Sequence, residues 1–206
     1  MKRGRAHSQP QQSQASGAKR PRLILASSSP RRAELLRNAR IAFTVLERKV
    51  PEVRRPHEWP EDFVRRIAGE KARAVFANHP DNFVLGADTV VVADGQVLGK
   101  PADAHDAVRM LRLLSGGSHL VTTGVCLLGP TVEDTRAETT TVSFGPLTDA
   151  EISQYVATGE PMDKAGAYAI QGIASRWVTH LEGCYFNVVG LPVPLVYRML
   201  REHGAL

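Results

Sequence analysis

Residues 23–38 restrict the fold more than any other part of the sequence, because a strand pattern, a turn and a helix start follow one another there. Residues 23–26 are all apolar, which predicts a short buried strand. The serines at 27–29 predict a turn. Ser29 is a favourable N-cap and Pro30 suits the first helical position, so we predict a helix over residues 30–38.

Helix and strand patterns continue to alternate along the chain, and Asp103 and a Thr148/Glu151 capping box mark two of the helix starts. A loop-rich stretch with short strands is expected over residues 160–190. The order of elements predicts an α/β fold with a mixed, twisted central sheet and flanking helices. Further helices are predicted at 60–77, 103–114, 148–157 and 192–204, and strands at 84–92, 96–98, 119–128 and 136–144.

The net charge of +5 comes entirely from the start of the chain. Residues 1–20 are rich in Gln, Ser and Pro and contain five basic residues and no acid; without those five, the 26 basic residues fall to 21, the number of acidic ones. We expect a disordered basic leader over 1–20 and one domain over 21–206. An arm that binds nucleic acid is the less favoured alternative for this leader.

Two further features bear on location. There is no run of 18 apolar residues and no apolar core of a secretory signal in the first twenty residues, so we expect no membrane association. Cys126 and Cys184 fit neither a metal-binding spacing nor a disulfide framework. A cytoplasmic protein is the simplest interpretation, and association into a homodimer stays open.

The turn at residues 27–32 is a candidate anion site. A strand that turns directly into a helix N-terminus directs several backbone N–H groups at one point. The same short segment supplies the hydroxyl of Ser27 and the guanidinium groups of Arg31 and Arg32. A guanidinium group pairs with phosphate oxygens in a bidentate manner. The alternative is an ordinary capped helix with two solvated arginines.

Asp88 interrupts an otherwise apolar strand. An unpaired buried carboxylate is costly, so this residue needs a partner or a function. Facing a cleft, it could hold a divalent cation or accept a proton from water. Small residues at 86 and 87 would let a ligand approach the backbone. The alternative is a strand-end aspartate that a local hydrogen bond satisfies.

Two lysines and one small-residue segment complete the unusual features. Lys71 occupies a position of the apolar stripe of its helix, so its ammonium must extend to solvent or meet an anion such as phosphate. Lys100 lies near a turn but lacks the glycine spacing of a P-loop. Residues 163–172, which include Lys164 and Gln171, place polar side chains around a run of small residues, as expected of backbone shaped around a ligand.

With these residues in place, the sequence resembles the Maf family of nucleotide pyrophosphatases from Leu23 to the final helix. Where the family usually has an acidic pair after the second strand, this chain has Pro51-Glu52. The shared blocks are Ser27–Arg32, Glu34-Leu35-Leu36, Glu70-Lys71-Ala72, Gly86–Thr89, Gly99-Lys100-Pro101, Ser115-Gly116, Asp163–Gly172 and Val189-Gly190-Leu191-Pro192.

The resemblance implies two lobes around a cleft, in a Maf/ITPase-like fold, and hydrolysis of a nucleoside triphosphate between its α- and β-phosphates. It implies Asp88 as the proton acceptor and a divalent cation, Mg²⁺ or Mn²⁺, for which Asp88 and Glu34 are the candidate ligands. The resemblance implies substrate contacts from Ser27, Arg31, Lys71, Thr89, Lys100, Lys164 and Gln171.

Three positions separate the subfamilies, and this chain has Arg31, Thr89 and Gln171 there. That set resembles the dTTP/UTP branch, whereas the branch acting on methylated guanine nucleotides typically carries Trp, Gln and Glu. A glutamine amide offers a donor and an acceptor to the imide edge of uracil or thymine. The predicted activity is therefore dTTP/UTP pyrophosphatase, a nucleotide-pool house-cleaning enzyme. Two alternatives remain, namely another base preference such as modified pyrimidines, and a non-catalytic nucleotide-binding regulator of cell division.

Overall fold

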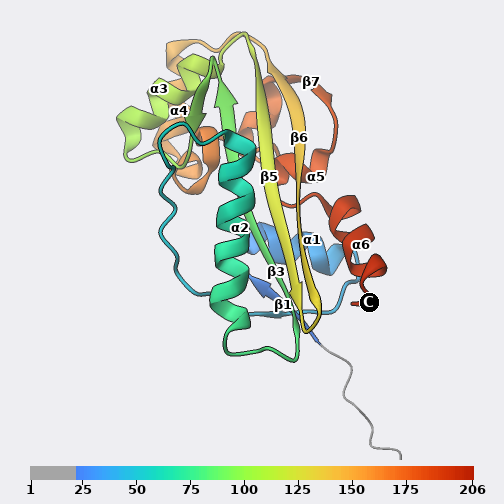
Figure 1. Cartoon of the computed structure of the whole chain (residues 1–206). Coiled ribbons are helices and arrows are strands. Elements are labelled where there is room, and N and C mark those ends of the chain that lie inside the picture. Colours follow the sequence, from blue (N-terminus) through green and yellow to red (C-terminus); the bar gives the residue numbers. More distant parts are fainter. Residues whose placement is uncertain (1–21) are drawn as a thin grey trace, which may run out of the picture.

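A computed structural model describes residues 22–206; the predicted basic leader lies outside this range. A seven-stranded mixed sheet crosses the molecule in the order β2-β1-β3-β5-β6-β7, with β4 paired to β3 (Figure 1). The β1 strand runs parallel to both of its neighbours, and the remaining pairs are antiparallel. The strands are β1 Leu23–Ala26, β2 Thr44–Val45, β3 Phe83–Ala93, β4 Gln96–Leu98, β5 Ser118–Gly129, β6 Val132–Phe144 and β7 Val178–Glu182.

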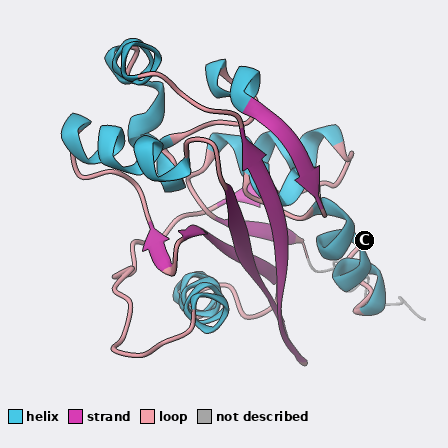
Figure 2. Cartoon of the chain, turned by 90° about the horizontal axis from the view of Figure 1, so that it is seen from above, coloured by secondary structure: helices cyan, strands magenta, loops and turns pink. Residues whose placement is uncertain are grey.

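Helices cover both faces of this sheet, and α2 is set apart from the other helices on its own face (Figure 2). Alternate residues of β3 divide accordingly: Val84 and Val90 pack with α2, whereas Leu85 and Val91 belong to the main core with α1, α3, α4 and α6. The helices are α1 Pro30–Asn38, α2 Pro60–Phe76, α3 Ala104–Leu114, α4 Asp149–Ala157, α5 Tyr185–Val189 and α6 Val193–Glu202, with 3₁₀ turns η1 Glu160–Asp163, η2 Ala165–Ala167 and η3 Ile173–Trp177.

The predicted α/β class and most predicted elements are confirmed. Helix α1 has the predicted bounds, the Asp103 side chain accepts from the backbone N–H of Asp106, and the capping box at Thr148 is formed. The prediction for residues 160–190 was wrong in part, because the stretch contains three 3₁₀ turns, β7 and the short helix α5. The α5 sequence is rich in aromatic and β-branched residues, which favour strands, but tertiary contacts override that preference. Buried Asn187 of α5 donates to the carbonyl of Val121, 2.9 Å away.

Helix α2 lies unusually close to the sheet because two glycines face it. A Cβ on Gly86 would stand 2.1 Å from the carbonyl oxygen of Ala68, and one on Gly124 would stand 2.4 Å from that of Val64. The expectation that Gly86 and Ala87 admit a ligand was therefore wrong. The space beside Gly86 is filled by α2, and Ala87 is buried in the main core. Close packing of α2 matters for function because this helix carries Lys71.

A buried histidine gives the fold a predictable response to acid. His119 of β5 is 2% exposed, its Nε2 lies 2.8 Å from the Tyr168 hydroxyl, and burial lowers its pKa to about 4. Between pH 6.5 and 4 the unfolded chain binds a proton at this residue that the folded chain excludes. Stability should therefore fall as pH decreases through this window, by an amount on the order of 3 kcal/mol for this group.

Chemical denaturation of the wild type and His119→Gln at several pH values from 7 to 4 would test this expectation. The free energy of unfolding should decrease more steeply with acid in the wild type, because the glutamine does not titrate. The exposed His105→Gln serves as the matched control and should follow the wild type. Parallel curves for wild type and His119→Gln would contradict the assignment.

Within residues 22–206, no helix combines the length and the apolar character needed to cross a membrane.

Candidate active site

The cleft lies beside a stretch of β3 that, among the described strands, has a hydrogen-bonded neighbour on one side only. Strand β1 pairs with β3 only as far as Gly86, and β4 pairs with it only from Val91 onward. Between these points, residues 87–90 pair with β5 alone among the described strands. Asp88 and Thr89, which point to opposite faces of the sheet, are thus both next to the opening.

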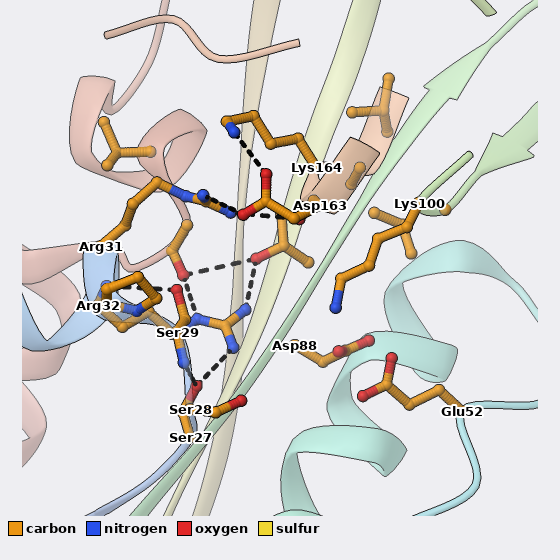
Figure 3. A pocket seen from close by; sticks show the side chains of 18 of the residues that line it. Ser27, Ser28, Ser29, Arg31, Arg32, Glu52, Asp88, Lys100, Asp163 and Lys164 are labelled. Carbon is orange, nitrogen blue, oxygen red and sulfur yellow. Dashed lines mark hydrogen bonds and ion pairs between the residues drawn. The ribbon is translucent and has the colours of Figure 1, made fainter. Parts of the chain in front are cut away.

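A cavity of about 790 Å³ occupies this opening, which is ample for a nucleotide. Its lining comes from the β1–α1 turn, the loop before α2, β3 and the segment 163–171, with Lys100 entering from beyond β4 (Figure 3). The sequence-predicted residues that meet here are Ser27, Arg31, Lys71, Asp88, Thr89, Lys100, Lys164 and Gln171. Glu34 does not join them: it is exposed and lies off the cavity lining.

Arg32 is the central residue of the β1–α1 turn. Its guanidinium donates to the carbonyl of Gly190 at 2.7 Å, to Ser27 Oγ at 3.1 Å and to Thr89 Oγ1 at 3.0 Å. Ser27 Oγ also accepts from the backbone N–H of Ser29. Arg32 therefore ties the turn to β3 and to the loop after α5, and Thr89 has a structural partner at the cavity wall. The sequence indicated Arg32 only together with the adjacent Arg31, as two guanidinium groups of a candidate anion site.

Arg31 and Lys164 meet at Asp163, which bridges α1 and the η1 region (Figure 3). Arg31 Nη1 lies 2.9 Å from Asp163 Oδ2, and Lys164 Nζ lies 2.5 Å from Asp163 Oδ1. Partial burial raises the pKa of Asp163, but hydrogen bonds and charges from these two cations outweigh it and lower the pKa to about 2. Two cations are thus held side by side at the cavity by one carboxylate.

Lys71 joins two carboxylates on the opposite side of the cavity. Its Nζ lies 2.8 Å from Asp88 Oδ1 and 2.7 Å from Glu52 Oε1. The lysine does not extend into solvent, because its side chain is only 14% exposed. Lys100 is directed toward the same pair in Figure 3. Lys71 therefore occupies a position within the apolar stripe of α2, and its ammonium pairs with two acids.

The environment separates the pKa values of the two carboxyl groups. Burial raises the pKa of Asp88 above its usual value, and Lys71 and Arg32 only partly offset this effect. Burial also opposes ionisation of Glu52, but the hydrogen bond and charge of Lys71, together with Lys100 and Arg32, lower its pKa. Such a pair is typical of sites where one carboxyl group moves a proton and the other stays charged.

Glu52 is a site residue that sequence reasoning did not select. The sequence did hint at Glu52 through its position. The family that this chain resembles usually has an acidic pair there, and in this chain Pro51 replaces the first acid while Glu52 keeps the second. The retained acid is the one that contacts Lys71. The loop that carries it has no regular secondary structure, so periodicity could not indicate its direction.

The cavity fits a hard divalent cation. Lys71 holds one oxygen of each carboxylate, which leaves the second oxygens of Asp88 and Glu52 for another cation. Within residues 22–206, neither cysteine nor histidine lines the cavity, so the donors are oxygens, as Mg²⁺ and Mn²⁺ prefer. Glu52, in place of Glu34, is the acid that the fold brings to Asp88.

One other acidic and histidine cluster could offer ligands to a metal, namely Asp134, Glu202 and His203. Both of its carboxylates are already paired with Arg136, and His203 Nε2 lies 2.9 Å from Asp134 Oδ2. None of these residues lines the cavity. The cluster connects the C-terminal end of α6 to β6 by ion pairs.

Comparison with known proteins gives matches along almost the whole described chain. The sequence model of a family described as Maf-like protein matches residues 22–203. The chain is 61% identical to the dTTP/UTP pyrophosphatase of Koribacter versatilis over 184 residues, which cover 89% of this chain and 95% of the relative. It is 51% identical to the dTTP/UTP pyrophosphatase of Geobacter metallireducens over 187 residues, covering 90% and 97%.

Among solved structures, the Staphylococcus aureus Ham1 protein aligns with a TM-score of 0.51 at 11% identity, over 88% of this chain and 99% of that chain. This likeness shows the fold. Because the family model spans nearly all described residues and the relatives share half or more of their aligned residues, the chain belongs to the Maf family.

Proposed function

We propose that this protein is a nucleoside triphosphate pyrophosphatase that hydrolyses dTTP and UTP to the monophosphate and pyrophosphate. The relatives cited above carry the name dTTP/UTP pyrophosphatase, and they align along almost their whole length. The observation that carries the proposal is the Glu52–Lys71–Asp88 arrangement in the wall of a cationic cavity. A house-cleaning role in the nucleotide pool follows from that activity.

Asp88 is the proposed general base. A carboxylate with a raised pKa is a better proton acceptor, and burial supplies that shift here. Water attacks the α-phosphorus, its proton passes to Asp88, and an oxygen–phosphorus bond forms. The bond between the α-phosphorus and the bridging oxygen breaks, and pyrophosphate leaves with the electron pair. Lys71 keeps Asp88 in place through their 2.8 Å contact.

The cations around the cavity are the proposed phosphate contacts. Arg31 and Lys164 face the cavity from one side and Lys100 from the other. Phosphate oxygens would replace part of the contact that Asp163 makes with Arg31 and Lys164. A divalent cation held through the free oxygen of Glu52 would neutralise charge on the phosphate oxygens, while Oδ2 of Asp88 accepts the proton.

Gln171 is the proposed contact to the base. Gln171 is exposed and lies in a turn at the edge of the cavity. Its amide can donate to one carbonyl of uracil or thymine and accept from the imide N–H. A glutamate at this position could only accept, which suits the N–H donors of guanine instead.

The deciding experiment is a panel of dTTP, UTP, CTP and GTP, each assayed with Mg²⁺ and with Mn²⁺ for monophosphate and pyrophosphate. We expect pyrophosphate release to be fastest with dTTP and UTP. Tight nucleotide binding without pyrophosphate release would favour the non-catalytic regulator.

A cytoplasmic location belongs to the same proposal, supported by the two free cysteines Cys126 and Cys184.

Loss of individual cations should weaken triphosphate capture. Arg31→Ala removes a proposed phosphate contact. Lys71→Ala removes the ammonium that holds Asp88 and Glu52. Charge-assisted contacts of this kind are typically worth about 1.5–3 kcal/mol, so kcat/KM for UTP should fall by roughly 10- to 150-fold in each variant. The Lys71 variant should show the larger loss, because it also leaves Asp88 and Glu52 unpaired. Steady-state pyrophosphate release measures both parameters.

The control for these substitutions is Arg112→Ala, which removes an exposed arginine paired with Asp149 on the surface. Its kinetics should match the wild type. If Lys71→Ala left both KM and kcat unchanged, Lys71 would have no part in substrate binding or in holding Asp88.

A further inference from the structure

The turn that carries Gln171 is fastened on both sides by one pair of side chains. Residues 169–172 form the turn, which is closed by a 3.0 Å hydrogen bond from the N–H of Gly172 to the carbonyl of Ala169. Gln171 occupies its third position and lines the cavity. A surface turn of this kind is ordinarily mobile. Here, side chains from α4 and η1 bind the backbone at the start of the turn and directly after it.

Those side chains are Tyr155 of α4 and Glu160 of η1. The Tyr155 hydroxyl accepts from the N–H of Ala169 at 3.2 Å and donates to Glu160 Oε1 at 2.9 Å. The same Oε1 accepts from the N–H of Ile173 at 3.1 Å. One phenol–carboxylate pair therefore holds residue 169, the first of the turn, and residue 173, which follows the turn.

Two independent features show that this brace is built into the fold. A Cβ on Gly172 would stand 2.2 Å from Glu160 Oε1, so only glycine lets the carboxylate approach the turn this closely. Tyr155 is 1% exposed, and its ring packs edge-on against Trp177 with the ring centroids 5.2 Å apart. The hydroxyl thus has a fixed position from which to bind the turn.

We propose that Tyr155 and Glu160 are positioning residues for base selection, acting through the Gln171 turn. This inference rests on the proposed contact between Gln171 and the base. Distinguishing a uracil edge from a cytosine edge requires the donor and acceptor of one amide to be placed within hydrogen-bond geometry. Residues that fix the turn therefore control selectivity among bases without touching the nucleotide.

The test uses Tyr155→Phe, Glu160→Ala and the conservative Glu160→Gln, which keeps one carbonyl oxygen as an acceptor. For Tyr155→Phe and Glu160→Ala, we expect KM for UTP to rise by about tenfold and the UTP-to-CTP ratio of kcat/KM to fall by a similar factor. The kcat for UTP should stay within about twofold of the wild type, because Asp88 is untouched. Glu160→Gln should restore part of the selectivity.

Inorganic triphosphate serves as a probe of the phosphate end alone. Its inhibition constant should be unchanged in all three variants if the brace acts on the base. The backbone carbonyl of Glu160 accepts from Lys164 Nζ at 2.6 Å, so a disturbed η1 would weaken triphosphate inhibition as well. An equal loss of UTP and inorganic triphosphate binding, or an unchanged UTP-to-CTP ratio, would overturn the inference.

A double-substitution experiment separates this inference from the proposed function. If Gln171→Ala abolishes base selectivity, adding Glu160→Ala should reduce it no further. If Gln171→Ala leaves selectivity unchanged, the proposed base contact itself is wrong. If Gln171→Ala abolishes selectivity but Tyr155→Phe does not, only the brace is wrong. Tyr197→Phe, at an exposed tyrosine of α6, is the matched control and should retain wild-type kinetics.

Discussion

Asp88→Asn is expected to reduce pyrophosphate release from dTTP and UTP by about 10²–10⁴-fold, because it removes the proposed proton acceptor for the attacking water. The asparagine keeps the size of the side chain and an oxygen that can accept from Lys71, so the fold should persist. KM should change much less than kcat. Initial rates of pyrophosphate release and thermal unfolding of the same preparations would measure both properties.

The control for this substitution is Asp81→Asn, which makes the same chemical change at an exposed residue before β3. Its turnover should equal that of the wild type. Near-wild-type turnover in Asp88→Asn would remove Asp88 from the mechanism. A large decrease in melting temperature alongside lost turnover would instead assign Asp88 a structural role as the partner of Lys71.

Gln171→Glu is expected to change the choice of substrate. The carboxylate cannot donate to a carbonyl of uracil, and two acceptors then face each other at a cost of about 1–3 kcal/mol or more. The kcat/KM for dTTP and UTP should fall by roughly one to several orders of magnitude. GTP should lose much less or even gain, since guanine presents N–H donors, provided that the cavity admits the purine.

Pyrophosphate release across dTTP, UTP, CTP and GTP would decide this point. Gln154→Glu, an exposed glutamine of α4, is the matched control, and its substrate profile should be that of the wild type. An equal loss on all four nucleotides would mean that Gln171 shapes the turn or the phosphate end. The base-contact assignment would then be wrong.

Several parts of the site could be predicted from the sequence because local patterns determine them. The cap at Ser29 and Pro30 defines the start of α1, and with it the β1–α1 turn. The apolar stripe of α2 placed Lys71 on a buried face, where its ammonium had to extend to solvent or meet an anion. The apolar surroundings of Asp88 meant that its carboxylate needed a partner or a function. Neither pattern could show that these two residues meet, since they lie in different elements.

Helix geometry explains why the Glu34 prediction had no support in the structure. Glu34 follows Arg32 by two positions, which turns it about 200° around α1. Arg32 faces the cleft, so Glu34 faces solvent. Both residues lie in segments shared with the resembled family, so the resemblance alone did not show which of them faces the cleft. The acid that reaches Asp88 is Glu52, carried by an irregular loop whose path depends on its packing beside α2.

The sequence by itself determined most of the strands, the main helices and the set of charged residues available for chemistry. Only the tertiary structure decided where they converge, because the cleft depends on pairings between distant segments. Strand β1 leaves β3 after Gly86 and β4 joins it from Val91, which exposes the short stretch that contains Asp88 and Thr89. Strand periodicity gives the face of each side chain, but only the register between strands leaves this edge open.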